Sequence, residues 1–247
     1  MQEHWEKYKK PLEGKPATIA FNADFIDECD GYEYMYVGFV KVALKNPKED
    51  GLVSEDEVDM IAQIEDRLEF EALRWRVGKY VGMIVTDGHV NFIYYLKFDF
   101  EWSNAVSEAM KHFDYPYTYG SSEDMQGNVY KNILYPNPLQ WQIINNHHAC
   151  HQLASQGDTL TQKRAIEHKA YFQNKEDQAK FLGMILEEGF KKMEELEPKE
   201  GYGCGVSFFR LDTPNYYEID DITLYLINKA QECNGAYDGW ECSVVKS

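Results

Sequence analysis

The last third of the sequence alternates strand and helix periodicities in an order that leaves the chain few ways to fold. The segments follow one another as strand, helix, strand, strand, helix and strand: 164–172, 175–188, 190–197, 203–212, 216–233 and 237–245. Asn174 caps the first helix and Gly189 ends it, while Asn234-Gly235 ends the second helix. This order predicts two split β-α-β halves.

Two halves of this kind form a ferredoxin-like domain. Right-handed crossovers put both helices on one face of a four-stranded antiparallel sheet. A unit of roughly 85 residues can fold alone, although its core is modest. We therefore predict a ferredoxin-like domain over residues 161–247, with the domain boundary in the polar segment 156–159.

Residues 1–160 show the patterns of a larger α+β domain with an antiparallel sheet. Alternating apolar residues predict strands over 19–25, 33–44, 79–86, 89–98 and about 115–121. Asp87-Gly88 lies between two of these segments, as in a tight β-hairpin. The capping box that begins at Ser54 and the pair Asn137-Pro138 each predict the start of a helix. A further amphipathic helix follows Trp102.

The charge balance restricts the class of partner. The chain has 42 acidic and 25 basic residues, for a net charge of −17, and both parts carry an excess of acid: −12 over 1–162 and −5 over 163–247. Binding to a nucleic-acid backbone depends on lysine and arginine displacing counterions. We therefore expect no direct contact with DNA or RNA, and either a basic protein partner or an acidic surface that keeps the protein soluble.

The sequence also indicates the compartment. No apolar run approaches the ~18 residues of a membrane-spanning helix, and the first residues do not resemble an export signal. The five cysteines are odd in number and form no CxxC pair. We therefore predict reduced, mostly buried thiols in a cytoplasmic protein without membrane contact.

Histidines are concentrated in the segment His147-His148-Ala149-Cys150-His151. On a helix, His147 and His151 share a face and could chelate a metal ion. The segment lacks the glutamate of an HExxH motif, and no second dense group of ligands lies nearby. We therefore predict no metal site, and keep His147 with His151 as the alternative. Cys150 could act as a nucleophile, but a small buried thiol is the commoner role.

The remaining motifs favour binding over catalysis. The sequence has no GxSxG, no GxxxxGKS or GxxxxGKT, and no GxGxxG after a strand. In the last predicted strand, Tyr237 and Trp240 flank Asp238-Gly239. Tyrosine and tryptophan are favoured at protein interfaces. The alternative is that Trp240 seals the core and Gly239 permits a bulge.

The section from about residue 163 to the end resembles the regulator of ribonuclease E activity B family. The residues that carry the resemblance are Ile166-Glu167-His168, Phe172, Phe181, Leu182, Glu188-Gly189-Phe190 and Tyr237-Asp238-Gly239-Trp240. The resemblance implies a non-catalytic protein that binds ribonuclease E and restrains RNA cleavage. The chain departs from the family in its plain end, 244–247, and in its large extra domain, so the fold is transferred better than the named partner.

The preceding section resembles an uncharacterised family, domain of unknown function six-nine-five. The matching features are Trp5, Tyr8, Pro11, Thr86-Asp87-Gly88, Leu134-Tyr135-Pro136 and Gly157-Asp158. That family supplies no activity.

Two hypotheses of different classes follow. The first is a protein-binding regulator of ribonuclease E or another ribonuclease, without a cofactor and not an enzyme. Its binding residues are expected to be His168, Tyr237, Asp238 and Trp240. The alternative is a metal-binding or small-ligand protein, or a hydrolase, with a site at the domain interface near His147, His151 and His168.

Overall fold

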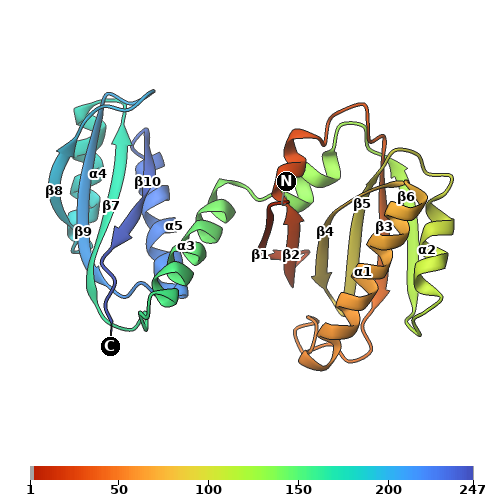
Figure 1. Cartoon of the computed structure of the whole chain (residues 1–247). Helices are drawn as coiled ribbons and strands as arrows, with labels where there is room; N and C mark the ends of the chain where they lie inside the picture. The colour runs from red at the N-terminus through yellow and green to blue at the C-terminus, as the bar shows by residue number, and fades with distance from the viewer. Residues whose placement is uncertain (1–2, 247) are drawn as a thin grey trace. The chain divides into compact units, whose positions relative to one another are not determined.

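We describe the chain from a computed structural model that covers residues 3–246 (Figure 1). It divides into two compact units, Met1–Asn137 and Pro138–Ser247, and each is described by itself. The division lies before the helix α3 (Pro138–Ser155), whereas the sequence pattern placed the boundary after this helix, at 160/161. The physical reason is that α3 packs against a helix of the second unit. No helix within residues 3–246 has the length and apolar composition to cross a membrane.

The first unit is a six-stranded antiparallel sheet with two helices. The strand order across the sheet is β1-β2-β4-β5-β3-β6. The strands are β1 (Trp5–Leu12), β2 (Lys15–Asn22), β3 (Tyr36–Ala43), β4 (Gly78–Thr86), β5 (His89–Leu96) and β6 (Tyr117–Glu123). The helices are α1 (Val58–Trp75) and α2 (Trp102–Met110), with short helical turns at Ala23–Asp27, Glu55–Glu57 and Tyr130–Leu134. The predicted hairpin is confirmed, because Asp87 and Gly88 both have positive φ, 52° and 70°, between β4 and β5.

Both faces of the middle strands are buried. Alternate residues of one strand lie on opposite faces, so Phe92 and Tyr94 of β5 pack under α1 and α2. Ile93 and Tyr95 lie on the other face, where the hydroxyl of Tyr95 donates to Asp124 (2.5 Å). The segment after Asp124 covers this face with Tyr130 and Leu134.

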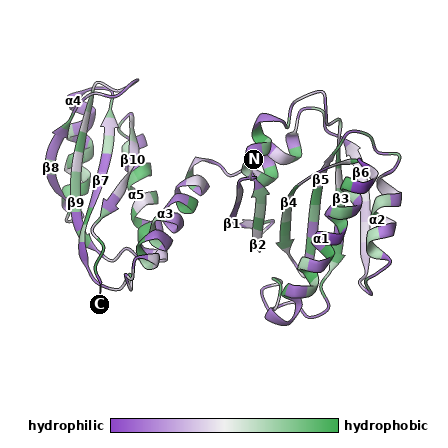
Figure 2. Cartoon of the chain, in the orientation of Figure 1, coloured by the Kyte–Doolittle hydropathy of each residue, from purple (hydrophilic) through white to green (hydrophobic). Residues whose placement is uncertain are grey.

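The edge strand β1 is absent from the sequence-based prediction. It contains three lysines and no regular apolar alternation, and it is coloured hydrophilic beside the hydrophobic β2 in Figure 2. An edge strand needs only one packed face, which here is carried by Tyr8. The strand predicted over 19–25 runs instead over Lys15–Asn22, and Asn22 then caps a short 3-10 helix by accepting from the backbone N–H of Asp24.

The second unit contains the predicted ferredoxin-like fold, which is confirmed. Its sheet has the strand order β10-β7-β9-β8, with all pairs antiparallel. After α3, the elements are β7 (Arg164–Phe172), α4 (Lys175–Glu187), β8 (Lys191–Leu196), β9 (Cys204–Asp212), α5 (Tyr216–Gln231) and β10 (Gly235–Cys242). Asn174 and Asn215 begin the two crossover helices, since each side chain accepts two backbone N–H groups of the first turn.

The two faces of this sheet differ. Phe172, Val206 and Phe208 point from β7 and β9 towards Phe181 of α4 and Leu226 of α5, and all five are fully buried. Within residues 138–246, no helix packs on the opposite face. The second unit therefore has one buried and one open sheet face.

A buried ion pair holds the turn after α3 against β7. The guanidinium of Arg164 donates to both carboxylate oxygens of Asp158, and it also donates to the carbonyl of Ser243 (3.0 Å). Asp158 accepts the backbone N–H groups of Leu160 and Val245, each at 2.8 Å. The hydrogen bond from Arg164 holds the pKa of Asp158 well below its usual range. Both charges are desolvated but fully hydrogen-bonded, as a buried pair requires.

Arg164→Ala should lower the free energy of unfolding of the second unit by about 3–5 kcal/mol, because the carboxylate of Asp158 would stay buried without its counter-charge. The measurement is a urea titration of the full chain, followed by hydrogen exchange of the β7 amides. The exposed pair of Lys169 and Glu241 supplies the control: Lys169→Ala should cost less than about 1 kcal/mol. Equal losses in the two variants would contradict the assignment.

Candidate functional site

The predicted binding residue His168 lies in the interior of the second unit. Its side chain projects from β7 to the helix side of the sheet and is 0% exposed. The imidazole stacks on Phe208, with ring centroids 5.6 Å apart, and meets Phe190 edge-on at 5.7 Å. Its Nδ1 lies 2.9 Å from the hydroxyl of Tyr237. Burial thus leaves a macromolecular partner no atom of His168 to contact.

The protonation of His168 follows from this burial. Burial, together with the nearby charge of Arg210, lowers the pKa of His168 to about 3. Nε2 is also buried and has no hydrogen-bond partner among the described residues. The imidazole is therefore neutral at physiological pH, and it fills an aromatic core as an uncharged ring.

A β-bulge in β10 positions the motif that contains the other predicted binding residues. Tyr237 pairs with Ala170 and Trp240 pairs with His168, although residues three apart in a regular strand point to opposite faces. The extra residue at Asp238-Gly239 restores both aromatic side chains to the helix side. Gly239 has φ +112°, a conformation that a side chain disfavours. Asp238 is exposed and forms an ion pair with Lys199.

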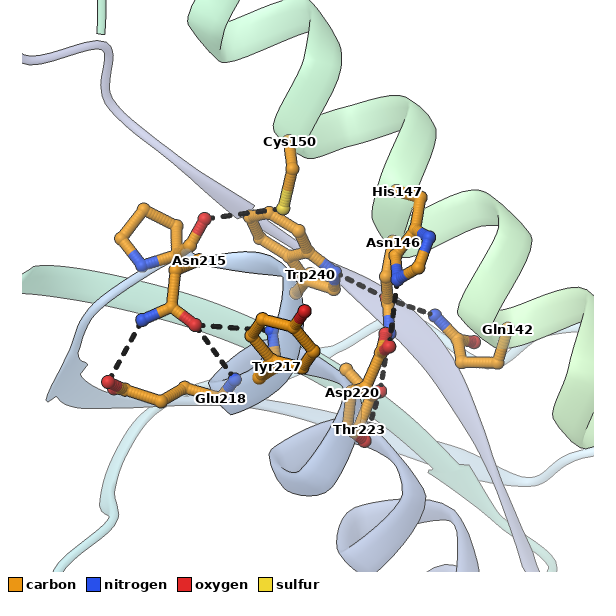
Figure 3. A network of polar contacts seen from close by, with 11 residues as sticks. Gln142, Asn146, His147, Cys150, Asn215, Tyr217, Glu218, Asp220, Thr223 and Trp240 are labelled. Atoms are coloured by element: carbon orange, nitrogen blue, oxygen red, sulfur yellow. Dashed lines mark hydrogen bonds and ion pairs between the residues drawn. The ribbon is translucent and has the colours of Figure 1, made fainter. Parts of the chain in front are cut away.

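Trp240 joins a polar network at the junction of α3, α5 and β10 (Figure 3). Its indole N–H donates to Oδ1 of the fully buried Asn146 (2.8 Å). The same oxygen accepts from Gln142 (2.9 Å), and the Asn146 amide donates to Asp220 (2.9 Å) and Thr223 (2.7 Å). Asn146 therefore makes all four hydrogen bonds that its side chain allows, which ties three elements together.

The structure places the histidines of the segment on α3 in different surroundings. Nε2 of His147 lies 2.9 Å from a carboxylate oxygen of Asp220, and its ring meets Tyr216 edge-on. His151 is exposed one turn further along α3. Among residues 3–246, no three histidine, cysteine, aspartate or glutamate side chains are grouped to hold a metal ion. His168 lies in a different environment, so the three histidines of the alternative hypothesis do not share one.

The thiol of Cys150 is also part of the interior. It is fully buried and donates to the carbonyl of Pro214 (3.2 Å) in the network of Figure 3. Burial, with a smaller contribution from Asp220, raises the pKa of Cys150 to about 12. A nucleophilic cysteine needs the thiolate form, so this environment opposes nucleophilic catalysis and favours packing.

The open face of the sheet carries a groove of about 380 Å³ that the sequence analysis missed. Met193 of β8 and Phe209 of β9 line it, with Glu167 and Glu241 from β7 and β10. Leu211 is 61% exposed, and it pairs in register with Ala165 at the same groove. The sequence of β9 indicates this groove. Apolar residues stand at both its even-numbered and its odd-numbered positions, whereas a strand with one buried face needs them at alternate positions only.

The charge on this open face is mixed, with an acidic centre. Glu167 and Glu241 are register partners on adjacent strands. Lys169 donates to Glu241 (2.7 Å), whereas Glu167 forms no ion pair within residues 3–246. Lys191 lies on the same face, paired in register with Phe209. The groove therefore places exposed apolar side chains beside two carboxylates; Glu241 is paired with Lys169, and Glu167 interacts with the same lysine without a short contact.

Comparison with known proteins finds two families in the chain. A model of the Family of unknown function (DUF695) matches residues 3–135, and a model of Regulator of ribonuclease activity B matches residues 143–242. The second match begins inside α3, in agreement with the division of the structure. No curated protein matches the chain. A crystal structure of an unknown protein from Galdieria sulphuraria is 10% identical, with 85% of this chain and 98% of that chain covered and a TM-score of 0.23.

The burial of His168 predicts a specific pH dependence. The folded state holds this imidazole neutral down to about pH 3, whereas the unfolded chain protonates it near pH 6.5. The unfolded state therefore binds the extra proton first, and His168 should remove about 1.5 kcal/mol of stability between pH 6.5 and about pH 5.

His168→Phe should abolish this part of the pH dependence, and the exposed His151→Gln should retain it. Hydrogen exchange of the β7 amides in the full chain at both pH values measures the difference between variants. An imidazole NMR titration of His168 with a midpoint between pH 6 and pH 7 would contradict the interpretation.

Proposed function

The chain belongs to the Family of unknown function (DUF695) and carries a C-terminal domain of the Regulator of ribonuclease activity B family, and from this premise we propose that it regulates a ribonuclease by binding it. The binding surface in this proposal is the open sheet face of the second unit. The observation that carries the proposal is the exposed apolar group on that face, formed by Met193, Phe209 and Leu211.

The exposed apolar group supports a protein partner. Met193 is 49% and Leu211 is 61% exposed, and Phe209 lines the same groove as Met193. Removing apolar area from water contributes roughly 25 cal/mol per Å². Methionine and aromatic residues are enriched at interfaces. A partner that covers these side chains removes them from water, and this burial stabilises the complex.

The charge on the face supports a partner with basic residues. Glu167 and Glu241 both line the groove, where one lysine, Lys169, interacts with both, and the chain as a whole carries a net charge of −17. A long-range acidic field accelerates encounter with a basic surface. The partner segment is therefore expected to combine an apolar anchor with a lysine or arginine that reaches Glu167. The same field opposes direct binding of RNA.

The remaining features support a non-catalytic, cytoplasmic role. The side chains of His168 and Cys150 are fully buried, which suits packing. All five cysteines are unpaired, and four of them are buried, as expected of a protein in a reducing compartment.

The test is direct binding of the full chain to ribonuclease E from the same cells, by titration calorimetry, with the rate of RNA cleavage measured in parallel. Leu211→Arg should weaken binding at least tenfold and relieve any inhibition, because it puts a charge into the apolar contact. Leu186→Arg is the matched control, since Leu186 is 49% exposed on α4, away from the open face. It should change the affinity less than twofold.

Two results would contradict the proposal. The first is an equal affinity of the Leu211→Arg and Leu186→Arg variants for the ribonuclease. The second is binding of the full chain to RNA alone, with no affinity for the ribonuclease.

A further inference from the structure

The helix side of the first unit's sheet is only partly covered. The core under α1 and α2 is built on β3, β4 and β5, and contains no residue of β1 or β2. These two strands extend beyond the helices at one edge of the sheet (Figure 1). A groove of about 390 Å³ lies between this uncovered strip, the start of α1 and the loop before it.

The floor of the groove is apolar. Val58 and Ile61 of α1 face Met83 and Val85 of β4, and Leu52 of the loop completes the wall. Val58 is 51% exposed, so its side chain is accessible to a molecule in the groove. Sites for small organic ligands are commonly concave, apolar and of a few hundred Å³, with a few polar groups that orient the ligand.

Three lysines line the same groove. Lys7 and Lys9 are alternate residues of β1 and pair in register with Ala20 and Thr18, so both lie on the helix side of the sheet. Lys48 comes from the loop that precedes α1. The ammonium groups of these lysines make no ion pair or hydrogen bond within residues 3–246. In a chain of net charge −17, this is a local concentration of unneutralised positive charge.

A protective role explains only part of this arrangement. Lysines on an edge strand prevent edge-to-edge association of sheets, and Lys7 and Lys9 suit that role. Lys48 is not on the edge strand, and the role requires no apolar hollow. Glu65 is the acidic residue of the lining, and its carboxylate accepts a hydrogen bond from the hydroxyl of Tyr80 (2.8 Å). The lining thus contains three cationic side chains and one carboxylate, and that carboxylate already accepts a hydrogen bond from Tyr80.

We propose that this groove binds an amphipathic anion, a carboxylate or phosphate head group on an aliphatic chain. The lysines Lys7, Lys9 and Lys48 hold the head group, and the floor around Val58 and Ile61 takes the chain. The volume admits an unbranched chain of about eight carbons. This inference concerns the first unit and does not depend on the proposed regulation of a ribonuclease.

The experiment is calorimetric titration of the full chain, without ribonuclease, at low ionic strength. Octanoate and octyl phosphate are the two probes, and they distinguish the head groups. Octanol lacks the charge and acetate lacks the chain, so neither should bind saturably. Raising the salt concentration should weaken binding of both probes, because screening reduces the attraction of exposed charges.

Combined Lys7→Gln, Lys9→Gln and Lys48→Gln replacement should weaken binding of the better probe at least tenfold. Lys41→Gln is the matched control, since Lys41 of β3 lies on the opposite face of the same sheet from the core residue Val40. The affinity of this variant for the probe should change less than twofold. Val58→Asp should also abolish binding; it stays compatible with folding because an acidic residue is favourable at a helix start.

Three outcomes would overturn the inference: no saturable binding of either probe, equal binding of octanol and octanoate, or unchanged affinity in the triple variant. Titration with a hexaglutamate peptide tests whether the lysines bind an acidic protein segment instead. If the peptide binds more tightly than both probes, the lysines serve a protein partner and the proposed ligand class is wrong.

Discussion

In each unit, a pair of helices covers the same face of an antiparallel sheet, so burial of the opposite face depends on another segment of the chain. In the first unit, the face opposite α1 and α2 is buried by the chain's own segment around Tyr130 and Leu134, which Asp124 anchors to Tyr95. In the second unit, no segment of residues 138–246 performs this role. The same architecture therefore produces one sheet with two buried faces and another with a face available for contact.

The residues that carry the family resemblance of the second unit are mainly interior residues. Ile166, His168, Phe172 and Phe181 are all fully buried, and the Tyr237–Trp240 motif encodes a bulge that turns both aromatic rings inward. The open face is built from other positions, Met193, Phe209 and Leu211 among them. The motif thus identifies the fold, while the contact chemistry lies in residues that the motif leaves out.

The sequence predicts the second unit well because its signals are local. Asn174 and Asn215 cap helices, Gly189 ends one, and apolar periodicity gives the order of elements. The sequence-based prediction placed the boundary at 160/161 and missed β1, because both features depend on tertiary contacts. The sequence of the helix 138–155 alone does not indicate which unit the helix packs against. The lysine-rich strand β1 lacks an apolar pattern of its own, and it is defined by its pairing with β2. For the same reason, the burial of His168 is set by Phe190 and Phe208, which are distant in the sequence.

The four hydrogen bonds of the Asn146 side chain tie α3 to the second unit, and they determine where the chain can be divided without loss of contacts. A fragment that starts after α3 would keep the ferredoxin-like sheet but would strip the indole of Trp240 and the hydroxyl of Thr223 of their partner. It would also expose Ile166 and Ile219, which pack beneath Cys150 and Leu153. The compact unit of the carboxyl-terminal half therefore begins at Pro138, one helix before the first strand of the ferredoxin-like sheet.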